Sequence, residues 1–170
     1  MEEMSYQELF EVGVSFESAV GEGTKGERAR IPKNNSRIIL TDDIVEKITS
    51  IDRKINILVS GEIWCPDFQI NVAILKRFID LNPNLEMSII TMGRGRKYIS
   101  RLIGIEKEDF KAPTIIFLDE EFNFLGKFQE RPKKVLELDF EEIKRDYYKG
   151  MYINDSINDF LEILLNKSVD

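Results

Sequence analysis

The chain contains no histidine and a single cysteine, Cys65. The lack of histidine excludes Ser-His-Asp and Cys-His nucleophile pairs, zinc sites with histidine ligands, and imidazole acid–base chemistry at neutral pH. One cysteine cannot form an internal disulfide or a cysteine-rich metal site. We therefore expect no metal and no cofactor. Any chemistry must rest on one thiol or on carboxylates, unless the protein acts by binding alone.

Long apolar runs and an excess of positive charge are also missing. No apolar run approaches the roughly 20 residues that span a bilayer, and the acidic start, residues 1–5, lacks the basic region of a signal peptide. We expect a cytoplasmic protein with no membrane partner. The net charge of −7 argues against a nucleic-acid partner, which would need clustered Lys and Arg. The basic segment 93–97 is expected to be a solvated loop that enters a helix.

The remaining composition, 42% hydrophobic and 32% charged residues, is typical of a globular protein, and the length predicts one domain over residues 1–170. Apolar periodicity and capping residues predict helices at 4–20, 41–50, 66–81, 96–103, 139–149 and 156–167, and strands at 54–60, 85–91, 115–118 and 124–128. The Gly-rich, charged segment 21–36 is predicted to be a long loop. Strands joined through helices should be parallel and the last two should form a hairpin, which indicates a mixed α/β sheet flanked by helices.

The segment 61–68, Gly-Glu-Ile-Trp-Cys-Pro-Asp-Phe, lies where the first predicted strand meets the long helix. It resembles the Trp-Cys-x-x-Cys turn of thioredoxins, with Phe68 in place of the second cysteine. Ala112 and Pro113, at the start of a later strand, resemble the site at which thioredoxins carry a cis proline facing the reactive thiol. The strand order, and Arg131-Pro132 after the last strand, add to the resemblance. It covers roughly residues 40–150 and implies a thioredoxin fold with helical extensions at 1–36 and 151–170.

The local chemistry of the turn agrees with this resemblance. A thiol at a helix N-terminus meets unpaired N–H donors and the positive end of the helix dipole, which favour the thiolate. Pro66 suits the first helical position, where its missing N–H has no helical partner. Trp64 is expected to form one wall beside the thiol. Asp67 would add negative charge near the sulfur, and its expected exposure would screen that charge.

Two departures from the thioredoxin pattern affect the chemistry. With Phe68 in the fourth motif position, the chain has no thiol that could resolve a mixed disulfide on Cys65. Val59 stands where thioredoxins bury an aspartate credited with proton handling. Both departures indicate that a two-electron dithiol cycle is absent. Phe68 is expected to fill core space, and the tyrosines of the C-terminal helices are expected to be packing and interface residues.

The resemblance implies two candidate functions. In the first, Cys65 is the catalytic nucleophile of monothiol exchange with a protein or low-molecular-weight thiol. Trp64, Pro66 and Asp67 would then shape its pocket, while Ala112 and Pro113 would hold the incoming substrate. In the second, the domain is redox-inactive and binds a protein partner through the same groove. Whether the chain is an enzyme, and its oligomeric state, stay open.

Overall fold

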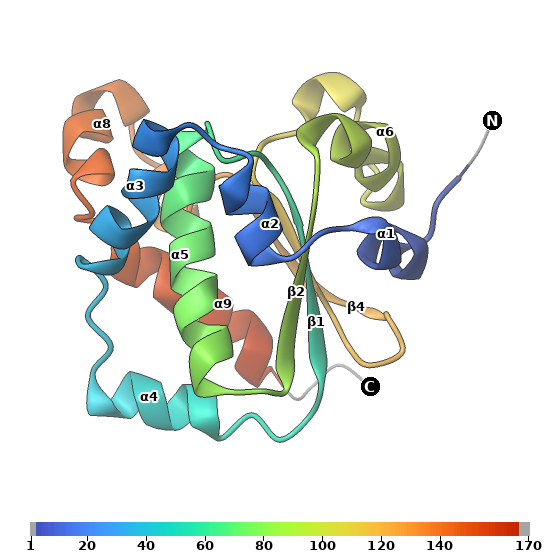
Figure 1. Ribbon diagram of the computed structural model, residues 1–170, viewed down its shortest axis with the longest axis horizontal. Coiled ribbons are helices and arrows are strands. Elements are labelled where there is room, and N and C mark those ends of the chain that lie inside the picture. The colour runs from blue at the N-terminus through green and yellow to red at the C-terminus, as the bar shows by residue number, and fades with distance from the viewer. Residues whose placement is uncertain (1–2, 167–170) are drawn as a thin grey trace.

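The structure, a computed structural model, describes residues 3–166 (Figure 1). Within these residues, four strands form one sheet in the order β2-β1-β3-β4. The strands are β1 (Ile55–Ser60), β2 (Leu85–Ile90), β3 (Thr114–Leu118) and β4 (Phe124–Gln129). β1 pairs with β2 in parallel and with β3 antiparallel, and β3 and β4 form an antiparallel hairpin. The predicted mixed sheet is therefore confirmed, including the parallel first pair and the final hairpin.

Helices cover both faces of this sheet. They are α1 (Tyr6–Val12), α2 (Phe16–Gly21), α3 (Lys25–Asn35), α4 (Asp42–Thr49), α5 (Pro66–Leu81), α6 (Met92–Leu102), α7 (Lys133–Leu136), α8 (Phe140–Tyr148) and α9 (Ile153–Leu165). α1 and α6 pack on one face, and α5 and α9 pack on the other, with α3 lying against α5 (Figure 1). None of the helices between residues 3 and 166 combines the length and the apolar character needed to cross a bilayer.

β1 is buried along its whole length because both of its faces pack against helices. Side chains alternate between the two faces of a strand. Ile57 and Val59 accordingly belong to the larger core on the α5 side, whereas Leu58 belongs to the smaller core under α1 and α6. This central position fixes the end of β1, from which the Trp-Cys-Pro-Asp-Phe turn departs into α5.

A close approach at Gly61 sets the path of that turn. A Cβ at this glycine would lie 2.6 Å from Cδ2 of Phe68 and 3.4 Å from Cβ of Pro113, so the backbone passes where a side chain would collide. Phe68 is fully buried in the larger core, which confirms that it fills core space. The ring therefore occupies, in this fold, the position at which a second thiol would stand.

The N-terminal region differs from the prediction of one helix over 4–20. The chain forms α1 and α2 instead, each capped by a serine, and an extended segment separates them. In this segment Val14 pairs with Ile89 at the edge of the sheet, with N–H to carbonyl distances of 2.8 and 2.9 Å. The prediction was wrong because the sheet edge supplies backbone partners at Val14 that local periodicity does not reveal.

The predicted loop over 21–36 was also wrong, since this segment contains α3. Thr24 caps the helix through a reciprocal pair of bonds, in which its hydroxyl accepts from the N–H of Glu27 and the Glu27 carboxylate accepts from the N–H of Thr24. Such a capping box satisfies two N–H groups that otherwise lack partners at the helix start. Glycine content suggested a loop, but Gly23 precedes the helix and Gly26 lies in its exposed first turn.

The basic segment 93–97 was expected to be a loop that enters a helix at residue 96, but the helix, α6, already begins at Met92 and contains the whole segment. α6 begins directly after β2, where the Thr91 hydroxyl accepts a hydrogen bond from the N–H of Arg94. Gly95 is buried against Ser60 of β1, so the absence of a side chain allows α6 to lie close to the sheet. Gly104, after the end of this helix, has φ +71°, the left-handed conformation that commonly ends a helix.

Candidate functional site

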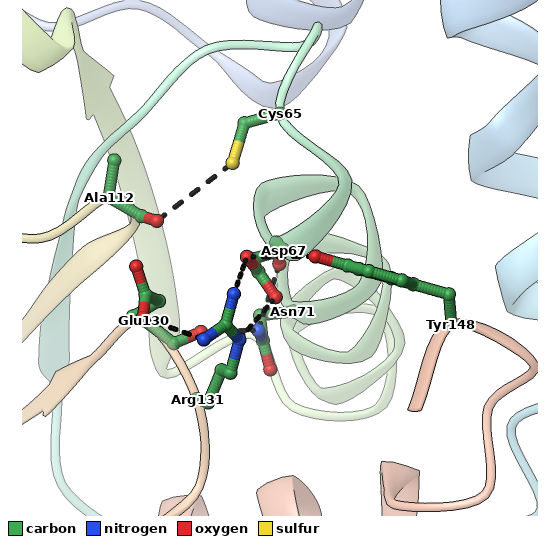
Figure 2. A network of polar contacts seen from close by, with 7 residues as sticks. All are labelled: Cys65, Asp67, Asn71, Ala112, Glu130, Arg131 and Tyr148. Carbon is green, nitrogen blue, oxygen red and sulfur yellow. Dashed lines mark hydrogen bonds and ion pairs between the residues drawn. The ribbon is translucent and has the colours of Figure 1, made fainter. Parts of the chain in front are cut away.

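Cys65 occupies the N-cap position of α5, at the end of the turn that follows β1. Its Sγ lies 3.9 Å from the carbonyl oxygen of Ala112 (Figure 2), and the Ala112–Pro113 peptide bond is cis, as the resemblance implied. The fold therefore brings together the two sequence features that are far apart along the chain. The Cys65 residue is only 8% exposed. Its neighbours Trp64 and Pro66 are exposed on either side of it, Trp64 by 52%.

The surroundings of Cys65 oppose ionisation of its thiol. Burial raises the pKa of Cys65 above its ordinary value, and the negative charges of Asp67 and Glu130 act in the same direction. The backbone N–H groups of Phe68 and Asp67, at the start of α5, act against this by lowering the pKa. Burial is the largest of these contributions, so the helix N-terminus does not produce the stabilised thiolate that its position alone would favour.

Asp67 was expected to be exposed and is instead 5% exposed. Its carboxylate points toward the guanidinium of Arg131, as Figure 2 shows. Nε of Arg131 donates to Oδ1 of Asp67 at 3.2 Å, and Nη2 donates to Oδ2 at 3.2 Å. The Tyr148 hydroxyl lies 3.5 Å from Oδ2. Asp67 is thus bound by Arg131 and Tyr148, and its contact with a substrate stays a prediction.

Arg131 connects the start of α5 to the end of the hairpin and to the C-terminal helices. Its Nη1 forms an ion pair with Glu130 at 3.0 Å, and its guanidinium lies 3.5 Å from the ring centroid of Phe140 in α8. Burial raises the pKa of Asp67 although the charge of Arg131 lowers it, so the cost of burying this carboxylate exceeds the attraction of its partner. In the sequence Arg131 stood out only together with Pro132, as a pair after the last strand that adds to the resemblance, and no local pattern paired it with Asp67.

Tyr148 was expected to be a packing or interface residue. The structure places its hydroxyl beside Asp67 and its ring against Phe140, so it packs and also contacts the turn. Asn71, one helical turn after Asp67, donates from Nδ2 to the Asp67 carbonyl at 2.8 Å and to the Glu130 carbonyl at 3.4 Å. These contacts hold the first turn of α5 against the end of β4 (Figure 2). Between residues 3 and 166, no three His, Cys, Asp or Glu side chains converge as metal ligands would.

The family model described as thioredoxin matches residues 13–144. The chain belongs to the thioredoxin family. It is similar in structure to a protein of unknown function from Pseudomonas aeruginosa, with 36% identity, a TM-score of 0.88, and coverage of 95% of this chain and 98% of that chain. An HIV epitope scaffold is similar to the same degree, with 36% identity, a TM-score of 0.87, and the same coverage of both chains. No curated protein matches significantly.

A groove of about 550 Å³ lies beside the thioredoxin turn, between α3 and the first turns of α5. It is lined by Thr24, Gly26, Glu27, Arg30, Asn34, Trp64, Pro66, Gln69, Ile70 and Tyr148. Trp64 and Pro66 flank Cys65 in the chain, so this groove opens next to the thiol. The wall that α3 supplies was not predicted, because the glycines and charges of segment 21–36 favoured a loop. The signal that could have found it is Thr24 followed three residues later by Glu27.

Proposed function

We propose that this thioredoxin-family protein binds a segment of a partner protein beside Cys65 and does not run a thiol–disulfide cycle. The observation that carries the proposal is the state of Cys65, which is 8% exposed and has a pKa raised by burial. Phe68 and Val59, both fully buried and apolar, stand where the family resemblance places a second thiol and a proton-handling aspartate. The surface around the thiol nevertheless keeps an exposed tryptophan and an adjoining groove.

The second candidate is monothiol exchange, and one observation favours it. Sγ of Cys65 lies at the start of α5 and 3.9 Å from the Ala112 carbonyl, which is the place from which a thiolate would attack a bound disulfide. In that reaction the thiolate would form a bond to one sulfur of the partner disulfide, and the other sulfur would leave as a thiolate and take up a proton from water. An external low-molecular-weight thiol would then attack the mixed disulfide and release Cys65, because the chain has no other cysteine.

The rate at which iodoacetamide alkylates Cys65 in the native protein, measured against pH, separates the two candidates. Binding without chemistry predicts slow alkylation at neutral pH and a rate that rises only above the free-thiol pKa of about 8.5. Below the pKa, each unit of increase in that pKa lowers the thiolate fraction about tenfold. The same protein unfolded in urea supplies the reference rate, and Cys65→Ser supplies the blank.

Incubation with hydroxyethyl disulfide, followed by intact mass measurement, tests exchange directly. The proposal predicts that the native protein gains no adduct at pH 7 during a time in which the urea-unfolded protein is fully modified. An alkylation rate already at its plateau near neutral pH, together with a thiol-reversible adduct on native Cys65, would overturn the proposal in favour of monothiol exchange.

A further inference from the structure

The groove beside the turn has two walls of different origin. α3, from the N-terminal extension, supplies Arg30 and Asn34, and α5 supplies Gln69 and Ile70. Trp64 stands at the end nearest Cys65. A volume of about 550 Å³ lies within the range of about 300–1,000 Å³ that is usual for ligand sites. The groove therefore has room for several groups of a bound molecule.

Two amide side chains in the walls have unused hydrogen-bonding atoms. Asn34 and Gln69 are each 5% exposed. Asn34 accepts a 3.5 Å bond from Arg37 at Oδ1, and Gln69 donates a 2.6 Å bond to the Ile63 carbonyl from Nε2. Within residues 3–166, Nδ2 of Asn34 and Oε1 of Gln69 have no hydrogen-bond partner in the structure.

Neither atom belongs to the fully buried, unpartnered side-chain atoms of the described residues, which are Oδ1 of Asn71 and the hydroxyl of Tyr147. Both atoms therefore stay accessible in the groove lining, where a ligand can pair with them. Nδ2 of Asn34 is a donor and Oε1 of Gln69 is an acceptor. A peptide group carries the complementary pair, a carbonyl oxygen and an N–H. The amides therefore indicate a ligand with main-chain peptide groups.

The charge on the α3 wall indicates the character of that ligand. α3 carries four Lys or Arg side chains and one Glu, a net charge of +3, in a chain whose net charge is −7. The Glu27 carboxylate also lines the groove, and it is held at the start of α3 by a 2.8 Å bond from the N–H of Thr24. Arg30 is exposed and lines the groove, so an anionic group of the ligand would find its counter-charge there.

Part of the groove lining is apolar. Trp64 is 52% exposed, and Pro66 and Ile70 lie in the same lining. A tryptophan in this position offers a large apolar surface together with one N–H donor, a combination that is enriched at the energetic centres of protein interfaces. One ligand with an apolar side chain, main-chain amides and a carboxylate would satisfy all three parts of the groove.

We infer that this groove binds an extended, acidic segment of a partner protein, with its main-chain amides against Asn34 and Gln69 and a carboxylate against Arg30. An apolar side chain of the segment packs on Trp64. This inference rests on the proposed function, because it identifies the chemistry of the partner segment that lies beside Cys65.

The test uses the full chain carrying Cys65→Ser, so that no thiol chemistry contributes. Three fluorescein-labelled peptides of eight residues share one pattern of Leu and Phe. The remaining positions are Asp and Glu in the acidic peptide, Asn and Gln in the neutral peptide, and Lys and Arg in the basic peptide. Fluorescence anisotropy should show saturable binding that is tightest for the acidic peptide. This binding should weaken as salt rises from 50 to 300 mM, because screening acts on exposed charges.

Two matched substitutions on α3 locate the binding. Arg30→Gln should weaken binding of the acidic peptide about tenfold, as expected for loss of one charge-assisted hydrogen bond. Lys33→Gln removes the same charge from an exposed position of the same helix outside the groove lining, and should change affinity less than about twofold. In ¹⁵N spectra of Cys65→Ser, the side-chain NH₂ resonances of Asn34 and Gln69 should shift on titration with the acidic peptide.

Equal affinity for the three peptides, the absence of saturable binding, or equal effects of the two substitutions would each overturn the inference. So would amide shifts confined to residues outside the groove. Failure of the proposed function looks different, since a rapidly alkylated Cys65 in the unsubstituted protein would overturn binding without chemistry whatever Cys65→Ser binds. An unreactive Cys65 combined with no preference for the acidic peptide would leave the proposed function standing and remove this inference alone.

Discussion

The ion pair between Asp67 and Arg131 gives the strongest quantitative prediction. Asp67→Ala should lower the free energy of unfolding by about 3 kcal/mol, near the lower end of the range for breaking a buried pair. The lower end applies because Arg131 keeps its 3.0 Å contact with Glu130 and its position over Phe140. Arg131→Met should cost a similar amount, because Asp67 would then be buried with Tyr148 as its remaining side-chain partner.

The double variant Asp67→Ala/Arg131→Met should cost far less than the sum of the two single changes. Burial raises the pKa of Asp67 even in the presence of Arg131, so the intact pair offsets only part of the cost of taking the carboxylate out of water. Removing both partners also removes that cost. We therefore expect a coupling energy of about 2–3 kcal/mol in a double-mutant cycle.

Urea unfolding followed by circular dichroism measures each free energy, with the slope m expected to stay constant. Each single change should lower Tm by about 6–12 °C in a domain of this size. The control pair is Lys133 and Glu162, an exposed ion pair at 3.2 Å, whose removal should cost less than about 0.5 kcal/mol. Single changes at Asp67 and Arg131 that cost under about 1 kcal/mol, or a double variant equal to their sum, would refute the reasoning.

Two further predictions concern pH and the packing of α6. Burial raises the pKa values of Asp67 and Glu130. The folded protein therefore binds more protons than the unfolded chain above pH 4. The contribution of these two groups to the free energy of unfolding should accordingly fall as pH rises through their folded pKa values. Urea unfolding midpoints measured from pH 4 to 7 check this prediction. The midpoint of Asp67→Asn should fall less with pH than that of the unsubstituted protein, and an equal fall in the two proteins would contradict the prediction. Gly95→Ala should destabilise the fold by about 1–3 kcal/mol because a Cβ there collides with Ser60, whereas Gly93→Ala meets no atom within 4 Å and should be neutral or stabilising. Thermal melts of the two variants compare them, and equal Tm values would show that α6 does not pack against β1 as described.

Much of the central fold could be predicted because its signals are local. β1 is a continuous apolar run, and Pro66 marks the start of α5 directly after Cys65. The cis bond before Pro113 followed from the family resemblance, which linked this proline to the thiol. The strand and the helix start depend on a few neighbouring residues, so the sequence carries them without knowledge of the rest of the chain. The cis bond was predictable only through the resemblance, because its partner Cys65 is 47 residues away.

The features that sequence analysis missed depend on distant partners or on a weak local signal. Val14 leaves the helical pattern because Ile89 offers it backbone partners across the sheet edge. Asp67 is buried because Arg131, 64 residues away, supplies two hydrogen bonds to its carboxylate. α3 had a local signal in Thr24 and Glu27, but glycine content pointed to a loop. Two of these features, α3 and the contact between Asp67 and Arg131, form one wall of the groove and hold the start of α5. The wrong predictions therefore concern the part of the protein that we assign to recognition.

The side chains of the turn, residues 64–68, fall into a buried group and an exposed group. Asp67 and Phe68 point into the protein, where one is bound by Arg131 and the other is fully buried in the core. Trp64 and Pro66 are exposed and line the groove. A buried carboxylate is therefore present near Cys65 and accepts two hydrogen bonds from Arg131, whereas position 59 holds the apolar, fully buried Val59. The inward side chains hold the turn and the outward ones border the α3 groove, and this division agrees with our proposal that the turn presents a binding surface.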